Sequence, residues 1–257
     1  MSTVRSIIGR HALVTGGGSG VGKAIALALA EAGMAVTICG RREAALAEVA
    51  KENDRIFGLA ADVTNEAEMA ALHQKAGAAR GPFDIVVANA GMAGSAPAHK
   101  TSLAAWQHTL DVNLTGAFLT VKPALAGMLG RKQGRIVFVA STAGLKGYAY
   151  VAPYVAAKHG VVGLMRALAA ETAQSGVTVN AVCPGFVETD MLEESIQRIV
   201  EKTGRSMEET RQTLSATNPQ GRFIQPEEVA DAVLWLCSDA ARSITGQAIS
   251  ISGGETW

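Results

Sequence analysis

Residues 12–22 read Ala-Leu-Val-Thr-Gly-Gly-Gly-Ser-Gly-Val-Gly, an apolar run that leads straight into a glycine-rich turn. An alanine-rich stretch with helical spacing follows, which predicts a strand, a tight turn and a helix N-terminus. Backbone N–H groups at such an N-terminus bind anions. A Cβ at Gly16, Gly20 or Gly22 would hold a pyrophosphate away or obstruct the packing of the helix. The segment therefore predicts a βαβ fold with a phosphate-binding turn.

The spacing of this turn, Thr-Gly-x-x-x-Gly-x-Gly, differs from the Gly-x-Gly-x-x-Gly dinucleotide fingerprint, and alone it also fits a purely structural connection. The end of the next strand gives a second indication. Gly40, Arg41 and Arg42 stand where an acidic residue would accept a hydrogen bond from an adenosine ribose. A guanidinium there pairs with a 2′-phosphate, which favours NADP(H) and leaves NAD(H) as the alternative. The other interpretation is that these arginines only flank a solvated helix start.

Short β-branched runs continue to alternate with longer alanine- and leucine-rich stretches, which predicts a parallel sheet covered by helices on both faces. The predicted strands are 12–15, 35–39, 56–60, 85–88, 135–140, 178–182 and 248–251. The predicted helices are 21–32, 42–51, 66–78, 103–129, 154–173 and 227–238. The polar, helix-forming segment 190–217 interrupts this rhythm. We therefore expect a single doubly wound, Rossmann-type α/β domain over 1–257, with a helical lid at about 190–217.

Composition narrows the range of functions. Apolar residues make up 48% of the chain and charged residues 18%, which favours a large core over disorder. Lys plus Arg and Asp plus Glu both total 23, so no net charge attracts nucleic acid or anionic lipid. Cys39, Cys183 and Cys237 have neither metal-ligand nor disulfide spacing, which predicts no metal and a cytoplasmic location. Residues 1–10 lack a signal-peptide core, and no long uninterrupted apolar run predicts a membrane span.

Tyr154 and Lys158 stand four residues apart on a predicted helix, so both side chains project from one face. An ammonium within about 6 Å of a phenol favours the phenolate, and the positive charge of an oxidised nicotinamide adds to this effect. Together they predict a lowered pKa for Tyr154 and a role in acid–base catalysis. Ser141 follows the fifth predicted strand, where its hydroxyl can polarise a bound carbonyl. Asn113 could hold a water against Lys158. Such Tyr-Lys pairs are common by chance, but here the pair accompanies a serine after a strand and a phosphate turn.

Together these residues resemble the short-chain dehydrogenase/reductase family over essentially the full length. The motifs that carry the resemblance are Thr15-Gly16-x-x-x-Gly20-x-Gly22, Asp62, Asn89-Ala90-Gly91, Asn113, Ser141, Tyr154-x-x-x-Lys158 and Pro184-Gly185. The resemblance implies that the catalytic residues are Asn113, Ser141, Tyr154 and Lys158. The residues expected to bind the cofactor are Thr15, Gly16, Gly18, Ser19, Gly20, Val21, Gly22, Arg41, Arg42, Asp62, Val63, Asn89, Ala90, Gly91, Tyr154, Lys158, Pro184, Gly185, Val187 and Thr189.

The family resemblance implies an NAD(P)(H)-dependent enzyme that interconverts a ketone and a secondary alcohol, a small-molecule substrate and a homotetramer. Two positions depart from the family: Ser19 stands where NADP-using relatives often carry Arg or Lys, and Ala88 replaces a common Asn. The arginines at the second strand and the long insert resemble 3-oxoacyl-thioester reductases, 3-hydroxyacyl-CoA dehydrogenases and aromatic polyketide ketoreductases. A small cyclic or aryl ketone or alcohol is the alternative substrate. A non-catalytic NADP(H)-sensing regulator is the alternative of another class.

Overall fold

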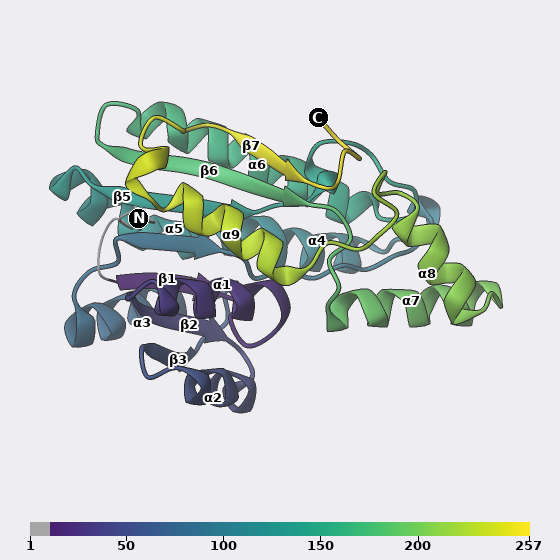
Figure 1. Ribbon diagram of the computed structural model, residues 1–257, viewed down its shortest axis with the longest axis horizontal. Helices are drawn as coiled ribbons and strands as arrows, with labels where there is room; N and C mark the ends of the chain where they lie inside the picture. Colours follow the sequence, from purple (N-terminus) through teal and green to yellow (C-terminus); the bar gives the residue numbers. More distant parts are fainter. Residues whose placement is uncertain (1–10) are drawn as a thin grey trace, which may run out of the picture.

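The computed structural model describes residues 11–257, and residues 1–10, where the sequence predicts no signal peptide, lie outside the described part. A seven-stranded parallel sheet runs through the molecule in the order β3-β2-β1-β4-β5-β6-β7 (Figure 1). The strands are β1 His11–Thr15, β2 Ala35–Gly40, β3 Ile56–Ala60, β4 Ile85–Ala88, β5 Gly134–Val139, β6 Val177–Pro184 and β7 Ala248–Ile251. The strand order reverses between β1 and β4, and open α/β sheets bind ligands at the carboxyl ends of strands beside such a switch point.

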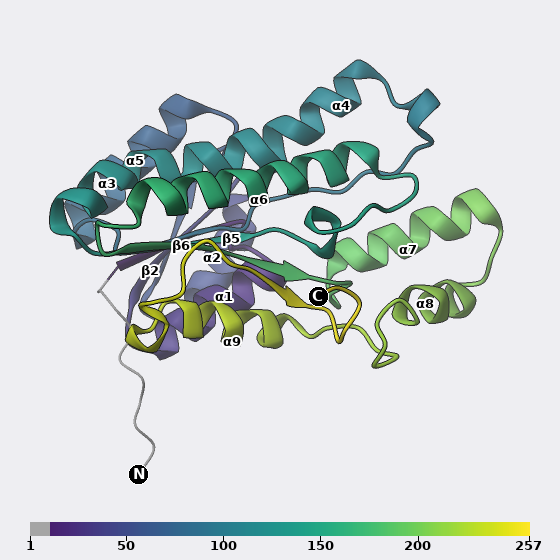
Figure 2. The ribbon, with the colours of Figure 1, turned by 90° about the horizontal axis from the view of Figure 1, so that it is seen from above.

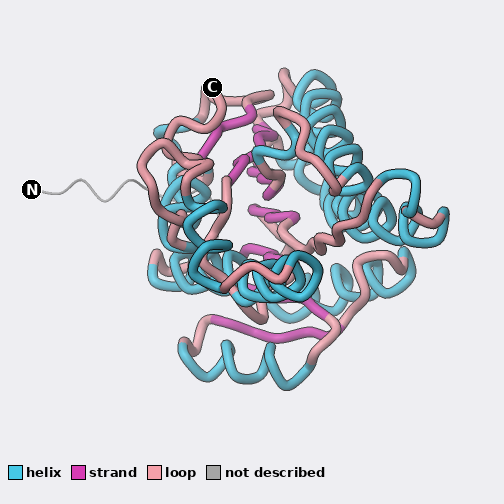
Figure 3. The backbone as a smooth tube through the Cα atoms, turned by 90° about the vertical axis from the view of Figure 1, so that its right-hand side faces the viewer, coloured by secondary structure: helices cyan, strands magenta, loops and turns pink. Residues whose placement is uncertain are grey.

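Helices cover both faces of the sheet (Figure 2). Helices α1, α2 and α9 lie on one face, and α3, α4, α5 and α6 lie on the other. The view along the sheet shows the strands enclosed between the two helical layers (Figure 3). The helices are α1 Gly20–Glu31, α2 Glu43–Glu52, α3 Glu66–Arg80, α4 Leu103–Leu110, α5 Gly116–Arg131, α6 Ala152–Thr172, α7 Asp190–Thr203, α8 Met207–Ser215 and α9 Pro226–Leu236.

The central strands β1, β4, β5 and β6 are buried along their whole length because a helical layer packs on each of their faces. One apolar cluster, which includes Phe138 and Met165, lies beneath α3, α5 and α6. The other, which includes Ile25 and Ile38, lies beneath α1, α2 and α9. This two-sided burial explains why the strands appear in the sequence as short, nearly uninterrupted apolar runs.

The seven predicted strands are confirmed, with ends that differ by at most two residues from those expected. The helix predicted over 103–129 is confirmed as one helical run, Leu103–Arg131, but its hydrogen-bond pattern is not regular throughout. A π-helical turn, Asp111–Thr115, separates α4 from α5, and the Gly116 N–H donates to the Asp111 carbonyl. The polar segment at 190–217 forms the two helices α7 and α8, which extend beyond the carboxyl ends of the strands (Figure 1).

The stretch Leu103–Arg131 is long and apolar enough, by length and composition, to cross a membrane. In the structure it contributes to the fold instead. Helix α5 packs on β4, β5 and α3, and α4 packs on α6. The π-helical turn in its middle carries the buried polar side chain of Asn113. A core helix of an α/β layer therefore accounts for the composition of this stretch.

Candidate active site

The glycine-rich turn joins β1 to α1 at the carboxyl edge of the sheet. Gly16 (φ +68°) and Gly20 (φ +52°) adopt left-handed backbone conformations that glycine tolerates without strain. A Cβ at Gly22 would collide with the Gly16 carbonyl oxygen, so the close packing of the turn on α1 requires glycine. Helix α1 begins at Ser19 without a side-chain cap. Its first N–H groups therefore suit the pyrophosphate of a dinucleotide, and the turn fits that group.

Hydrogen bonds tie the turn to the end of β4. Thr15 Oγ1 accepts from the N–H groups of Asn89 at 3.1 Å and of Ala90 at 3.2 Å. Asn89 Nδ2 donates to the Thr15 carbonyl at 2.9 Å. These three bonds fix the carboxyl ends of β1 and β4 relative to each other, at the switch point of the sheet.

Arg42 extends from the start of α2 to the phosphate turn, where Nη2 donates to Ser19 Oγ at 3.4 Å. The guanidinium therefore lies beside the position at which the sequence lacks the cation common in NADP-using relatives. Arg41 is exposed, and its charge helps to lower the pKa of Asp62, although the hydrogen bond from the Thr64 N–H is the larger cause. Asp62 Oδ1 accepts from the backbone and the hydroxyl of Thr64, which fixes the loop after β3.

Three other predicted cofactor residues lie around the turn and in the loop after β3. Gly18 lies against α2, where an added Cβ would be 3.2 Å from Ala45 Cβ. Val21 lies in the first turn of α1. Val63 is buried and fills the space beside Gly116 in α5, where a Cβ would lie 2.7 Å from Val63 Cγ2.

Ser141 lies two residues beyond β5 and caps the short 3-10 turn Thr142–Gly144, because its Oγ accepts from the Ala143 N–H at 3.1 Å. Its side chain also hydrogen-bonds to Tyr154. Pro153 in the first turn of α6 favours the start of the helix there, which presents Tyr154 to the end of β5. The structure thus brings Ser141 and Tyr154 together, although 13 residues separate them in the sequence.

Lys158 lies one turn further along α6 and is 4% exposed. Its Nζ donates to the Val139 carbonyl at 2.9 Å and lies 5.6 Å from the centroid of the Tyr154 ring. The bond to β5 draws the amine beneath the phenol. The predicted Tyr154–Lys158 pair is therefore present on one face of α6, as the four-residue spacing requires.

Burial affects the protonation of both members of the pair. It raises the pKa of Tyr154, against the opposing effect of the hydrogen bond from Ser141. It also lowers the pKa of Lys158 to about 8. In the protein chain itself, desolvation disfavours both charged forms. The lowered pKa expected for Tyr154 also depends on the positive charge of an oxidised nicotinamide, so it stays a prediction. The site favours a neutral phenol, which can donate a proton.

Asn113 lies in the π-helical turn and is 1% exposed. Its Nδ2 donates to the carbonyls of Met92 and Thr109, both at 2.9 Å, and its Oδ1 accepts from the Met92 N–H. A Cβ at Gly91 would lie 2.8 Å from Asn113 Oδ1 and 3.6 Å from Lys158 Nζ. Asn113 is therefore next to the predicted site, but both amide hydrogens are already used, so a water could contact only its oxygen or its backbone.

The segment after β6 closes the site on the side of the phosphate turn. Strand β6 ends at Pro184, and Gly185 begins the loop that leads to α7. Val187 pairs with the segment before α9 in an isolated parallel bridge. Thr189 Oγ1 donates to the Val187 carbonyl, and Thr189 Cγ2 would lie 3.1 Å from a Cβ placed on Gly20. The predicted cofactor residues after β1 and after β6 therefore meet at one place.

Helix α7 contacts the loop that follows β4. Arg198 Nη1 donates to the Ala93 carbonyl at 3.1 Å, and Lys202 Nζ donates to the Ser95 carbonyl at 2.9 Å. In the sequence, Arg198 and Lys202 stand out only as charged residues of the polar segment 190–217. Their spacing of four residues is the one signal that both belong to a single helical face.

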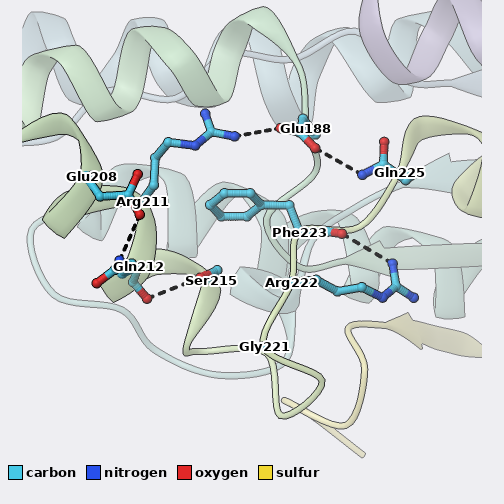
Figure 4. A pocket seen from close by; sticks show the side chains of 9 residues that line it. All are labelled: Glu188, Glu208, Arg211, Gln212, Ser215, Gly221, Arg222, Phe223 and Gln225. Carbon is cyan, nitrogen blue, oxygen red and sulfur yellow. Dashed lines mark hydrogen bonds and ion pairs between the residues drawn. The ribbon is translucent and has the colours of Figure 1, made fainter.

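A cavity of about 330 Å³ lies between α8 and the segment before α9 (Figure 4). Arg211 spans it and pairs with Glu188, at 2.6 Å, and with Glu193. Gln225 donates to the other oxygen of Glu188 at 3.0 Å. Ser141, Tyr154 and Lys158 do not line this cavity. Its lining comes from α8, Glu188 and the segment 221–225, so it is separate from the candidate site.

The doubly wound sheet, the phosphate turn at its switch point and the buried serine, tyrosine and lysine beside it define a class: dinucleotide-dependent oxidoreductases. Residues 10–199 match the short chain dehydrogenase family, and the chain belongs to this family. It is therefore an NAD(P)(H)-dependent enzyme that interconverts ketones and alcohols by acting on CH–OH groups of small molecules. The family resemblance and the Rossmann-type fold expected from the sequence are confirmed.

Similar proteins agree with this assignment. The chain is 39% identical over 251 residues to D-beta-hydroxybutyrate dehydrogenase of Cupriavidus necator, covering 96% of this chain and 97% of that one. It is 38% identical over 251 residues to the 3-oxoacyl-[acyl-carrier-protein] reductase of Aquifex aeolicus, with the same coverage. The crystal structure of a single-site variant of actinorhodin polyketide ketoreductase with NADPH superposes with a TM-score of 0.93 at 40% identity, covering 96% and 97% of the two chains.

Proposed function

We propose that this enzyme reduces a β-keto acyl compound to the β-hydroxy compound, with NADPH preferred and Tyr154 as the proton donor. The observation that carries the proposal is the convergence of Ser141, Tyr154 and Lys158 at the carboxyl end of β5, beside the glycine-rich turn. Relatives named for a 3-oxoacyl group and for β-hydroxybutyrate support this substrate class, because both compounds carry the reacting oxygen at the same carbon.

A bound NAD(P)H supplies the hydride for the carbonyl carbon. The chain supplies the other half of the reaction. Ser141 donates a hydrogen bond to the substrate oxygen and orients it toward Tyr154. Burial raises the pKa of Tyr154 and so keeps the phenol protonated, and Tyr154 then transfers this proton to the substrate oxygen as the alcohol forms. Lys158, with a pKa of about 8, is mostly protonated near neutral pH and stabilises the resulting phenolate.

The preference for NADPH rests on the second strand. Gly40 and the two arginines after it leave the end of β2 without a carboxylate. Arg42 lies beside Ser19 at the phosphate turn, where a guanidinium would pair with a 2′-phosphate. NADH, which lacks that phosphate, gains nothing from this charge. An acidic residue at the end of β2 would have favoured the opposite preference.

The substrate would lie beneath helices α7 and α8, which together with their flanking turns form the lid over about 190–217. Leu192, Ile196 and Phe223 form an apolar cluster under these helices. Arg198 and Lys202 hold α7 to the loop after β4. A lid of this kind excludes water from the reacting atoms. Its contacts with the rest of the acyl group would decide between a thioester and a free acid.

The test is an assay of purified protein for loss of NADPH absorbance. Acetoacetyl-CoA, acetoacetate, a cyclic ketone and an aryl ketone would be compared at equal concentration, each with NADPH and with NADH. We expect turnover of one of the two β-keto compounds to exceed that of the simple ketones by at least tenfold. Equal or faster reduction of the cyclic or aryl ketone would contradict the substrate class.

Replacing Tyr154 with Phe tests the mechanism. The ring and its packing remain while the proton is lost, so we expect kcat to fall by about 10²–10⁴-fold. The Kd of NADPH, measured by fluorescence, should change less than threefold. Tyr150→Phe is the matched control, because Tyr150 is 66% exposed in the loop before α6. A Tyr154→Phe variant that keeps more than a tenth of wild-type turnover would remove Tyr154 from its proposed role.

We further propose a cytoplasmic homotetramer that associates through α4, α5 and α6. Leu103 and Phe118 lie on α4 and α5 and are 79% and 38% exposed, which suits an interface. The three cysteines are free and buried, which suits a reducing compartment. Light scattering on the purified protein measures the assembly directly. A monomeric mass at micromolar concentration would contradict the proposal.

A further inference from the structure

Glu255 carries a carboxylate that the proposed mechanism does not use. It follows β7 and the pair Gly253-Gly254, and its side chain is only 2% exposed. Burial of a carboxylate is costly unless hydrogen bonds or a cation compensate it. Both are present here. Tyr148 Oη donates to Glu255 Oε1 at 2.6 Å, and Lys146 Nζ lies 3.1 Å from the same oxygen.

These contacts continue toward the candidate site. Tyr148 Oη lies 2.7 Å from the Oγ1 of Thr142, which is itself 3% exposed. A phenol has one hydrogen, and a carboxylate can only accept, so Tyr148 donates to Glu255 and accepts from Thr142. Burial and the hydrogen bond to Glu255 raise the pKa of Tyr148, which keeps the phenol neutral as a donor. The direction of the whole chain is therefore set by the carboxylate.

Thr142 is the residue after Ser141 and begins the turn that Ser141 caps. The loop from this turn to the start of α6 joins Ser141 to Tyr154. Thr142, Ala143 and Gly144 at the start of this loop are buried, whereas Lys146 and Tyr150 further along it are exposed. The hydrogen bond from Tyr148 to Glu255 connects the middle of this loop to the segment after β7, 107 residues further along the sequence.

The second oxygen of Glu255 faces another wall of the site. A Cβ on Gly185 would lie 3.1 Å from Glu255 Oε2, so the carboxylate approaches the backbone at that glycine closely. Gly185 begins the loop after β6 that leads to Val187 and Thr189. Glu255 thus lies between the loop that carries Ser141 and the loop that closes over the phosphate turn.

We propose that Glu255 is a positioning residue, which holds the Thr142–Tyr148 turn through the Tyr148 hydroxyl and thereby aligns Ser141 and Tyr154 for hydride transfer. The proposal rests on the proposed function of these two residues. It assigns no contact between Glu255 and the substrate. Loss of the carboxylate would free the loop, lower the fraction of aligned complexes and slow the chemical step, while the dinucleotide site stays intact.

The test combines kinetics with hydrogen exchange in the full-length protein. We expect Glu255→Ala and Tyr148→Phe each to lower kcat about tenfold, with the Kd of NADPH changed less than twofold. The kcat of the double variant should lie within twofold of the kcat of either single variant, because both substitutions break the same chain of hydrogen bonds. With NADPH deuterated at the transferred position, the isotope effect on kcat should rise, since hydride transfer becomes more rate-limiting. Glu255→Gln keeps an acceptor oxygen and should stay within threefold of wild type.

Amide hydrogen exchange separates this proposal from the assignment of function. In both single variants, exchange in residues 142–150 should increase while exchange in β1 and α1 remains unchanged. Tyr150→Phe, on the same loop, should match wild type in every measurement. Unchanged exchange, or faster exchange with kcat and the isotope effect unaltered, would overturn the positioning role. A wild-type protein inactive on every ketone would instead contradict the proposed function, and the exchange data would still decide whether the tether exists.

Discussion

Arg42 shows how one side chain can supply a charge that a neighbouring position lacks. Ser19 is uncharged, and from the sequence this weakens the preference for NADP(H). In the structure the Arg42 guanidinium lies against the Ser19 hydroxyl at 3.4 Å, so a cation is present at the turn all the same. It comes from the start of α2 rather than from the turn. The cation is exposed, so its effect on binding should be moderate and should weaken as salt increases.

Replacing Arg42 with Ala tests this at the residue scale. We expect the Kd of NADPH to rise about tenfold and the Kd of NADH to change less than twofold, since only NADPH carries a 2′-phosphate. Titration of the protein fluorescence with each cofactor measures both values. Lys51→Ala is the control, because Lys51 is an exposed cation on the same helix whose nearest partner is Glu48. Equal weakening of both cofactors by Arg42→Ala would contradict a 2′-phosphate contact.

At the scale of elements, close approach decides where glycine is required. The β1–α1 turn brings the backbone at Gly22 against Gly16 and the Asn89 amide, with no room for a methyl group. Gly77, in contrast, lies within α3 and has no heavy atom within 4 Å of an added Cβ. The same substitution should therefore have opposite effects at these two positions.

Gly22→Ala should lower the free energy of unfolding by about 1–3 kcal/mol, because the backbone of the turn must move to accept the methyl group. It should also weaken NADPH binding by at least tenfold, since the turn no longer has the proposed shape. Gly77→Ala should raise the free energy of unfolding by about 0.5–1 kcal/mol through helix propensity, without any effect on binding. Urea denaturation and cofactor titration of both variants measure these differences. Normal binding by Gly22→Ala would show that the turn does not hold the dinucleotide.

The π-helical turn Asp111–Thr115 is a second feature at this scale. A regular helix over 103–131 would turn Asn113 by a different angle and separate it from the Met92 backbone that it now binds on both sides. The turn thus connects α4 and α5 to the loop after β4. Helix α7 binds the same loop through Arg198 and Lys202. Helix α7 and the buried Asn113 therefore hold adjacent residues, Met92 to Ser95, of one loop.

On the scale of the whole molecule, the carboxyl and amino ends of the strands have different roles. The carboxyl ends of the strands carry the candidate site. At the amino end of β1, the buried side chains of His11 and Phe83 pack with the half-buried His73. His73 Nε2 donates to the Thr120 carbonyl at 3.0 Å, and burial lowers the pKa of His73 to about 4. Burial also lowers the pKa of His11. The His11–Phe83–His73 cluster joins β1, α3 and α5. It stabilises the fold most when both histidines are neutral.

The lowered pKa predicts a loss of stability in acid. Below the ordinary histidine pKa of 6.5 the unfolded chain binds a proton that folded His73 takes up only near pH 4. Stability is therefore complete above pH 6.5 and falls as the pH drops toward 4, by at most about 1.4 kcal/mol per pH unit for one histidine. His73→Gln keeps an N–H donor but cannot be protonated, so its Tm should depend less steeply on pH in this range. His99→Gln, at an exposed position, should retain the wild-type slope, and an identical slope in His73→Gln would contradict the prediction.

The sequence alone predicts the seven strands, the doubly wound sheet, the phosphate turn and the Tyr154–Lys158 pair. These are local properties: apolar periodicity reports burial on one or two faces, glycines report close backbone approach, and a spacing of four residues places two side chains on one helical face. It also supports the family, because the separate motifs occur in one chain in a consistent order.

Only the tertiary structure decides what burial does to charge and which distant residues meet. No local pattern shows that burial raises the pKa of Tyr154 despite its hydrogen bond with Ser141. Nor does one show that Arg42 reaches Ser19 or that Glu255 hydrogen-bonds to Tyr148, since these contacts cross 23 and 107 residues of sequence. The physical reason is that solvation and long-range hydrogen bonds depend on how complete layers pack together, and that packing is a property of the assembled fold rather than of any single segment.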